Sequence, residues 1–254
     1  MIELGVGCTS FMLEEMGTRP LAAVSSAVLD SLANSQISVL WCRPMPGELP
    51  SRLQIINEVK HRSIRHAHIV QCSPEEFASG LMVDYRKIRT LQQRIHGIAV
   101  RSKSIRITSA GGSDLVTPLP PDGEWVLQGG IIEPGKFQNL PSGQMFCAPL
   151  SVNGVFVADA AMGEWFGPRY PEISKYPLTI HIADGRCVDL YSENHRLARE
   201  FLLYIKSSPN GNRLSELSLG TNLGLSGYTG NPILDEHRPG AHIALGDSFI
   251  KTHI

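Results

Sequence analysis

The feature that most constrains the fold is a change in the spacing of apolar residues near residue 102. Before it, Ile88, Leu91, Ile95 and Ile98 recur at helical intervals and would line one face of a helix. After it, apolar and polar residues alternate, as in Ser104–Ser109, which is the pattern of a half-buried strand. The sequence therefore predicts an α/β part over residues 1–101 and a β-rich part over residues 102–254.

Short segments within the two parts predict the individual elements. Ile37–Cys42 and Ala67–Cys72 are apolar and β-branched, as buried strands of a small parallel layer would be. Helices are predicted at 20–34, 52–62 and 85–101, with a capped helix start at Ser73–Glu76. In the second part, strands are predicted at 104–109, 114–117, 125–127, 154–158, 178–182 and 186–191, with one late helix at 193–206. The expected fold class is α/β (α+β), a small N-terminal layer followed by a larger β-rich domain.

Composition excludes several classes of function. The chain has 23 Lys and Arg against 24 Asp and Glu, a net charge of −1, so no basic field favours nucleic acid or an anionic membrane. No apolar run reaches the roughly 18 residues of a spanning helix, and the N-terminus lacks the basic region of a signal peptide. The 5 cysteines form no CxxC pair, which argues against a zinc knuckle. We expect a cytoplasmic protein with no nucleic-acid or membrane partner.

Two groups of residues could carry chemistry. His66 and His68 would lie on one face of a strand, either as metal ligands or as the polar start of a buried strand. The last third of the chain gathers four carboxylates and two imidazoles among glycines, and these are ligands for Zn, Mn, Co or Fe, unless they form a solvated acidic loop. They are Glu216, Asp235, Glu236, His237, His242 and Asp247.

Four stretches, taken together, resemble the thermophilic metalloprotease family, the aminopeptidase T-like enzymes. Asn139–Pro149 is similar to that family's NLPxxEVFxAP segment, and Glu216–Asn222 is similar to ELGxGxN. Leu234–Gly246 resembles LDE…HxALG. Ile107–Leu115 resembles the form of a strand that the family shares with 2,5-dihydroxypyridine dioxygenases. The resemblance implies that the β-rich part is like the C-terminal domain of aminopeptidase T, here truncated at its C-terminus.

The resemblance also implies that most of the family's metal ligands are missing. Glu216 and His242 match a glutamate and a histidine of the two-metal site, whereas Gln144 stands where the family has its first glutamate. Phe249 stands at the position of the family's tyrosine, and the closing His-x-Asp motif is absent because the chain stops at Ile254. Glu216 and His242 are thus the expected remnant ligands. Gln144, Asn222 and Phe249 are the expected lining of the old cleft, with no catalytic residue and no cofactor.

Three functions remain open. The first is a degenerate protein that binds a peptide in the old cleft without metal and presents a substrate or precursor peptide to partner enzymes of a peptide-modification pathway. The second is a metal-dependent enzyme, either an aminopeptidase or an Fe(II) ring-cleaving dioxygenase, which would need Zn, Co, Mn or Fe(II). The third is a subunit that stabilises an active paralogue. Members of the family dimerise, so the resemblance implies a homodimer or a heterodimer with a paralogue.

Overall fold

The computed structural model describes residues 5–70, 72–73, 77–119, 124–163, 165–225, 227–228 and 232–248. The chain forms two compact units: unit 1 comprises Met1–Ser73 and Gly130–Leu140, and unit 2 comprises Pro74–Gly129 and Pro141–Ile254. This division differs from the predicted boundary at residue 102, because a segment from the middle of the chain returns to complete the sheet of unit 1.

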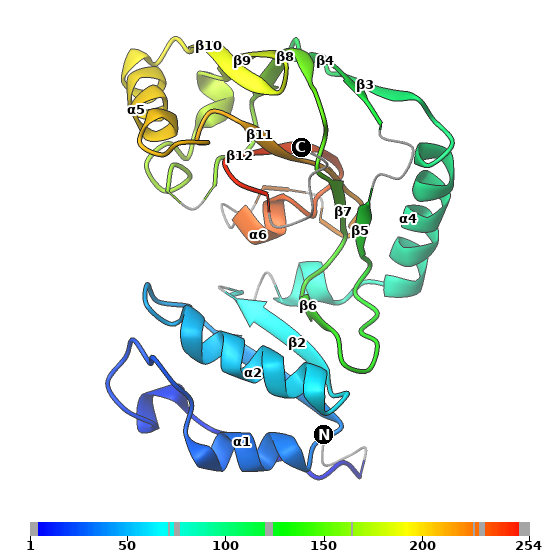
Figure 1. The fold of residues 1–254 in the computed structure, drawn as a ribbon, viewed down its shortest axis with the longest axis vertical. Coiled ribbons are helices and arrows are strands. Elements are labelled where there is room, and N and C mark those ends of the chain that lie inside the picture. Colours follow the sequence, from blue (N-terminus) through cyan, green and yellow to red (C-terminus); the bar gives the residue numbers. More distant parts are fainter. Residues whose placement is uncertain are drawn as a thin grey trace. The chain divides into compact units, whose positions relative to one another are not determined.

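Unit 1 is a three-stranded parallel sheet with helices packed on one face. Its strands are β1 (Ile37–Cys42), β2 (Arg65–Val70) and β6 (Phe137–Asn139), in the order β1-β2-β6. Helices α1 (Ser26–Ala33) and α2 (Leu49–His61) supply Leu32, Ile55 and Val59 to a core cluster that also contacts Leu40 of β1. Figure 1 shows α1, α2 and β2 in blue and cyan, and β6, from the middle of the chain, in green.

The prediction that Ile37–Cys42 is fully buried is wrong. β1 is an edge strand, and its side chains alternate between the helix-covered face and the opposite face. Ile37, Val39 and Trp41 lie on the opposite face, with 65%, 57% and 54% of their surfaces exposed. The apolar run was therefore not a sign of burial on both faces.

A buried ion pair ties the N-terminal segment of unit 1 to the start of α2. Glu48 is buried, and its carboxylate accepts hydrogen bonds from Arg19 Nε at 2.8 Å and Arg19 Nη2 at 2.7 Å. The main-chain N–H groups of Leu21 and Met45 donate to the same carboxylate, at 3.2 and 2.9 Å. The Arg19 guanidinium, opposed by desolvation, lowers the pKa of Glu48 to about 2.

Two buried imidazoles lie on the helix-covered face of β2. His66 and His68 are each 1% exposed, and their rings meet edge to face with centroids 4.7 Å apart. Nδ1 of His66 is 2.7 Å from Ser38 Oγ, whereas neither ring nitrogen of His68 has a hydrogen-bond partner in the described part of the chain. Burial lowers the pKa of His66 to about 4 and that of His68 to about 3.

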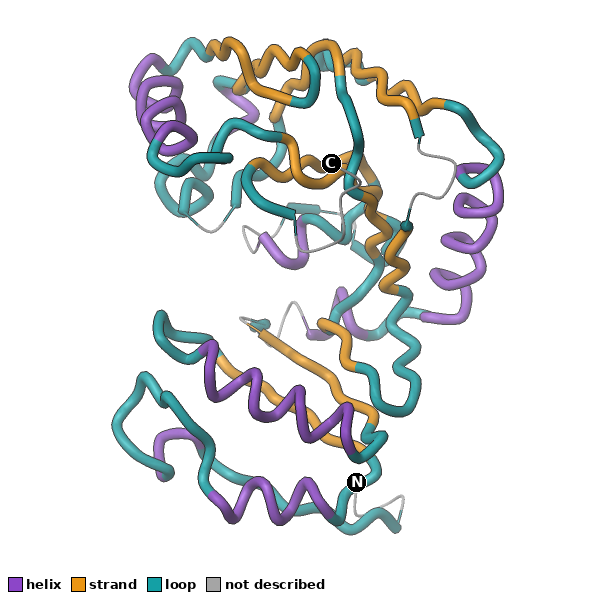
Figure 2. The backbone as a smooth tube through the Cα atoms, viewed as in Figure 1, coloured by secondary structure: helices purple, strands orange, loops and turns teal. Residues whose placement is uncertain are grey.

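Unit 2 contains two antiparallel sheets and most of the core. The five-stranded sheet has the order β10-β9-β8-β4-β3, and the four-stranded sheet has the order β12-β11-β7-β5. The strands of the first are β3 (Ser104–Thr108), β4 (Asp114–Pro118), β8 (Asn153–Ala158), β9 (Leu178–Ala183) and β10 (Arg186–Tyr191). The strands of the second are β5 (Trp125–Gln128), β7 (Gln144–Cys147), β11 (Leu214–Gly220) and β12 (Gly240–Leu245). Figure 2 shows these strands in orange.

Helices cover parts of these sheets. The longer ones are α4 (Tyr85–Ala99), which contacts β5, and α5 (His195–Lys206), which contacts β10. Leu197 and Ile205 of α5 join Ile180 and Ile182 of β9 in the main core cluster. The short elements of unit 2 are the π-helical turn η3 (Phe77–Leu81), the 3₁₀ turn η4 (Ile173–Lys175) and α6 (Pro232–Asp235). Unit 1 contains one more short element, the 3₁₀ turn η2 (Leu13–Glu15).

The predicted class, α/β (α+β), is confirmed, and the alternation after residue 102 does form strands. The helix predicted at 20–34 begins later, at Ser26, and the capped start predicted at Ser73–Glu76 lies largely outside the described residues. The apolar face of α4 was only partly predicted. Ile88 is buried as expected, but Ile98 is 63% exposed and Gln92 is fully buried. Among the described residues, no helix has the length and apolar character to cross a bilayer.

Candidate functional site

The strand register places four polar side chains on one face of the four-stranded sheet. Gln144 of β7 lies opposite Gly220 of β11, and Ser218 of β11 lies opposite His242 of β12. Glu216 precedes Ser218 by two residues, so its side chain points to the same face. The opposite face carries Leu217, Ile243 and Leu245, the last two packed against the main core cluster. The residues predicted from three separate segments therefore meet on one surface.

The Gln144 amide is the centre of this face. Gln144 is buried, and its Nε2 donates to Glu216 Oε1 at 3.0 Å and to Ser218 Oγ at 3.0 Å. An amide NH₂ offers two N–H donors, and both are used here. Gln144 is thus a hydrogen-bond donor, and the Glu216 carboxyl group is one of its acceptors. We call Gln144, Glu216, Ser218 and His242, together with Glu236, the amide cluster.

The side chain of Gln92, on α4, contacts the main chain of β7 at Gln144. The Gln92 side chain is fully buried, and Nε2 lies 3.1 Å from the carbonyl oxygens of Gln128 and Gln144 and 2.9 Å from Thr221 Oγ1. The Thr221 hydroxyl in turn lies 2.9 Å from the carbonyl oxygen of Gly143, to which it donates. One helix side chain therefore fixes β5, β7 and the loop after β11 with respect to one another.

Asn222 lies in that loop and is fully buried. Its Nδ2 donates to the carbonyls of Ser142 at 2.8 Å and Gly80 at 3.2 Å, while its Oδ1 accepts from the N–H of Gly224. The chain passes so close that a Cβ on Gly143 would lie 2.6 Å from Asn222 Cβ, and the φ of Gly143 is 140°. In this structure the Asn222 amide binds main chain.

The second carboxyl group of the amide cluster comes from Glu236, just after α6. Burial raises the pKa of Glu216, and burial together with the charge of Glu216 raises the pKa of Glu236 to about 8. The Glu236 side chain is 38% exposed, and its Oε1 lies 3.7 Å from Nε2 of the buried His237. Burial and the nearby Glu216 carboxylate both disfavour the ionised form of Glu236, and a cation placed beside it would favour that form.

The imidazoles beside these carboxyl groups are neutral. Burial lowers the pKa of His242, opposed by the hydrogen bond that Nε2 donates to the Arg238 carbonyl at 3.2 Å. Burial lowers the pKa of His237 to about 4. Because Nε2 of His242 carries the proton in that hydrogen bond, Nδ1 is its acceptor nitrogen.

The residues that the structure describes do not form a metal centre in this arrangement. A catalytic zinc site normally has three protein ligands. Among the described residues, no three His, Cys, Asp or Glu side chains come together in a way that could hold a metal ion. The same holds for the His66 and His68 pair of unit 1, which has no third ligand within that part of the chain.

The structure therefore brings together Gln144, Glu216 and His242 and places Asn222 in the adjoining buried loop. Phe249 lies outside the described residues. The sequence interpretation missed Ser218 and Gln92. Ser218 could have been found from its position two residues after Glu216, on the same strand face. Gln92 lies four residues after the buried Ile88, a spacing that shares a helix face, and this was the available signal.

Two solved structures have a similar fold. The 2,5-dihydroxypyridine dioxygenase from Pseudomonas putida KT2440 aligns with a TM-score of 0.57 and 23% identity, over 83% of this chain and 60% of that one. Wild-type AmpT, an aminopeptidase T, from Thermus thermophilus aligns with a TM-score of 0.58 and 14% identity, over 93% of this chain and 70% of that one. Neither a family model nor a curated protein matches the chain. The chain thus has an aminopeptidase T-like α+β fold.

Proposed function

We propose that this chain is a catalytically degenerate relative of the aminopeptidase T-like proteins, which binds a peptide at the amide cluster and does not cleave it. The observation that carries the proposal is the pair of hydrogen bonds from Gln144 Nε2 to Glu216 and Ser218. The first of them places an N–H donor, which cannot bind a metal ion, against Oε1 of Glu216.

The amide is a poor substitute for a carboxylate in a metal site. A carboxylate brings negative charge and two acceptor oxygens, whereas Gln144 presents its NH₂ group to Glu216. Metal binding would require the amide to rotate and two buried hydrogen bonds to break, each worth about 0.5–1.5 kcal/mol. With Gln144 in this state, Glu216 and His242 form no three-ligand group with another His, Cys, Asp or Glu in the described part of the chain.

A peptide amino terminus suits the same groups better. An ammonium needs nearby acceptor oxygens but no fixed coordination number, and it has three donors to distribute. Glu216 and Glu236 supply carboxyl oxygens, and burial raises the pKa of both groups, so a nearby cation would favour their ionised forms. We therefore propose that Glu216 and Glu236 hold the α-ammonium of a bound peptide.

A protein that holds a peptide end without cutting it can present the rest of that peptide to other enzymes. On this proposal the ligand is a substrate or precursor peptide of a peptide-modification pathway. The protein acts there as a homodimer or as a heterodimer with a paralogue.

Calorimetric titration of metal-free protein tests the proposal. We expect a peptide of four alanines with a free amino terminus to bind with micromolar affinity. The same peptide with an acetylated amino terminus should bind at least about tenfold more weakly, because the charge that pairs with the carboxylates is removed. Glu236→Gln should cause a similar loss, whereas Glu193→Gln, at an exposed position outside the amide cluster, should not.

Metal analysis tests the alternative, a metal-dependent enzyme. The protein would be incubated with Zn, Mn, Co or Fe(II) under reducing conditions and then freed of unbound ions. Stoichiometric metal that is lost in His242→Ala would overturn the degenerate reading and favour an aminopeptidase or a dioxygenase. Equal binding of the free and acetylated peptides would overturn the role of Glu216 and Glu236.

A further inference from the structure

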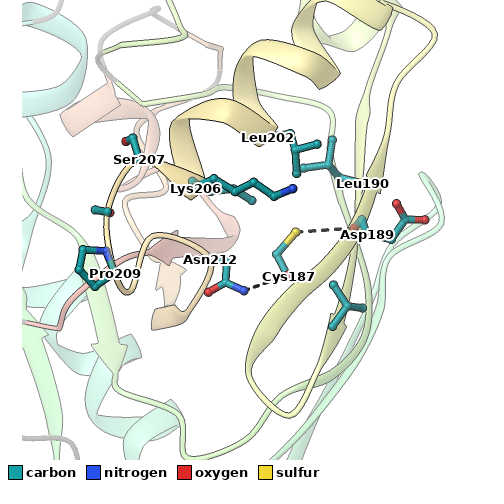
Figure 3. A pocket seen from close by; sticks show the side chains of 11 residues that line it. Cys187, Asp189, Leu190, Leu202, Lys206, Ser207, Pro209 and Asn212 are labelled. Carbon is teal, nitrogen blue, oxygen red and sulfur yellow. Dashed lines mark hydrogen bonds between the residues drawn. The ribbon is translucent and has the colours of Figure 1, made fainter.

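A cavity of about 790 Å³ lies in unit 2 between the outer edge of β10 and the end of α5 (Figure 3). The loop that follows α5 also lines it. The cavity shares no lining residue with the amide cluster. Its volume is that of a site for a small ligand or a short chain segment. None of the interactions of the amide cluster explains it.

The strand side of the cavity is an open sheet edge. β10 is the first strand in its sheet and pairs with β9 on one side only. On the other side, the N–H of Cys187 donates to the Asn212 carbonyl at 2.8 Å, and Arg186 bridges to Arg213. Beyond that point, over residues 188–191, no described strand pairs with the outer edge. Every second residue of an antiparallel strand points its N–H and C=O away from its partner strand, so this edge presents main-chain donors and acceptors.

The cavity is lined by apolar side chains and by the lysine Lys206. Leu190 and Ile205 line it, and Val188 at the rim is 64% exposed. Lys206 extends across the cavity toward β10 (Figure 3), and its ammonium has no ion-pair or hydrogen-bond partner among the described residues. Asp189 also lines the cavity, but its carboxylate points away from Lys206.

We propose that this groove binds an extended peptide segment, which adds as a strand to the free edge of β10 and places an acidic side chain on Lys206. An extended backbone is the ligand whose N–H and C=O groups match a strand edge, and apolar side chains on alternate positions would meet the wall. A single cation is too little for a nucleic-acid backbone. The groove is independent of the amide cluster and gives the protein a second point of contact with a chain.

Fluorescence anisotropy with synthetic peptides tests the proposal. The probe is a labelled peptide in which Val and Thr alternate around one central Asp, and a second probe has Lys in place of Asp. Lys206→Glu should weaken binding of the Asp probe about fivefold, the size of an exposed ion pair, and strengthen binding of the Lys probe. Lys87→Glu, an exposed lysine on α4, is the control and should change neither affinity.

Backbone methylation tests strand addition itself. Two versions of the Asp probe carry N-methyl groups on odd or on even residues, and only one set of N–H groups can face β10. One version should lose binding and the other should keep it. Equal binding of both versions, or no effect of Lys206→Glu, would overturn the proposal, as would light scattering that shows a dimer which Lys206→Glu dissociates. Acetylation of the probe's amino terminus should leave its binding unchanged, which separates the groove from the amide cluster.

Discussion

Gln144 Nε2 and Glu216 Oε1 are 3.0 Å apart across β7 and β11, although the two residues are separated by 72 positions in the sequence. This contact turns a pair of positions suited to metal ligands into a neutral donor and its acceptor. The amide is buried, and each of its N–H groups has an acceptor, Glu216 and Ser218.

The first prediction is that replacing the Gln144 amide by a carboxylate makes the stability of the protein depend on metal. Gln144→Glu would bring two buried carboxyl groups within hydrogen-bonding distance, so that one must stay protonated or repel the other. We expect the variant to lose about 1–3 kcal/mol of unfolding free energy in chelator, from the lost donors. Zn²⁺ or Mn²⁺ should restore part of that loss, since metal binding to the folded state stabilises it.

The measurement is thermal unfolding with chelator and with added metal. Gln93→Glu, on the exposed side of α4, is the control and should respond to neither. A Gln144→Glu variant as stable as the wild type and unaffected by metal would contradict the importance of the amide.

The second prediction concerns Gln92. Gln92→Leu keeps the volume of the side chain but removes the donor that lies near two strand carbonyls and the Thr221 hydroxyl. We expect a loss of about 1–3 kcal/mol in unfolding free energy, because buried acceptors lose a partner. Urea unfolding would measure it, with Gln93→Leu as the comparison. An equal effect of the two substitutions would show that the buried contacts of Gln92 contribute nothing.

The third prediction is a loss of stability in mild acid. His66 and His68 are neutral in the folded state, with pKa values of about 4 and about 3, but they take up protons near pH 6.5 once unfolded. Above pH 6.5 neither state gains a proton, so these residues add no pH dependence. As the pH falls from 6.5 toward 4, the unfolded state is favoured by about 1.4 kcal/mol per pH unit for each histidine.

Urea unfolding between pH 7.5 and 4.5 checks this slope. His68→Leu should flatten it by the share of one histidine, whereas His61→Leu, an exposed position at the end of α2, should leave it as in the wild type. A wild-type stability that stays constant over this range would show that the two imidazoles are hydrated in solution.

The fourth prediction concerns the ion pair of Arg19 and Glu48. Glu48→Ala removes the acceptor of four hydrogen bonds, and we expect a loss of about 1–3 kcal/mol and faster proteolysis before residue 21. The pKa of Glu48 is lowered to about 2, so its contribution is present above pH 4.5 and disappears as the pH falls from 4.5 to 2.

Limited proteolysis and urea unfolding of Glu48→Ala would measure both effects. Glu15→Ala changes an exposed carboxylate in the same segment and should behave like the wild type. If the two variants are cut at the same rate, the ion pair does not hold the segment.

Much of the fold was predictable where one spacing persists over several residues. The long helices α4 and α5 of unit 2 and the strand Asp114–Pro118 follow from periodicity, and the strand Ile37–Cys42 follows from its short apolar run. The strands Leu214–Gly220 and Gly240–Leu245 were not predicted, since serine and histidine on their polar face and the nearby glycines resemble a loop. The contact between Gln144 and Glu216 could not be inferred from spacing either, because it depends on the register of β7 with β11. Only the resemblance of the motifs related these two positions.

The position of β6 has a consequence for how the chain is made. β6 completes the sheet of unit 1 beside β2, yet it is translated after β3, β4 and β5 of unit 2. Domains usually fold in order as they leave the ribosome, with the N-terminal one finished first. Here the first 73 residues emerge with two of their three strands, and the missing strand arrives only after unit 2 has begun. Unit 1 is therefore complete only after part of unit 2 has been made, and neither unit is one continuous segment of the chain.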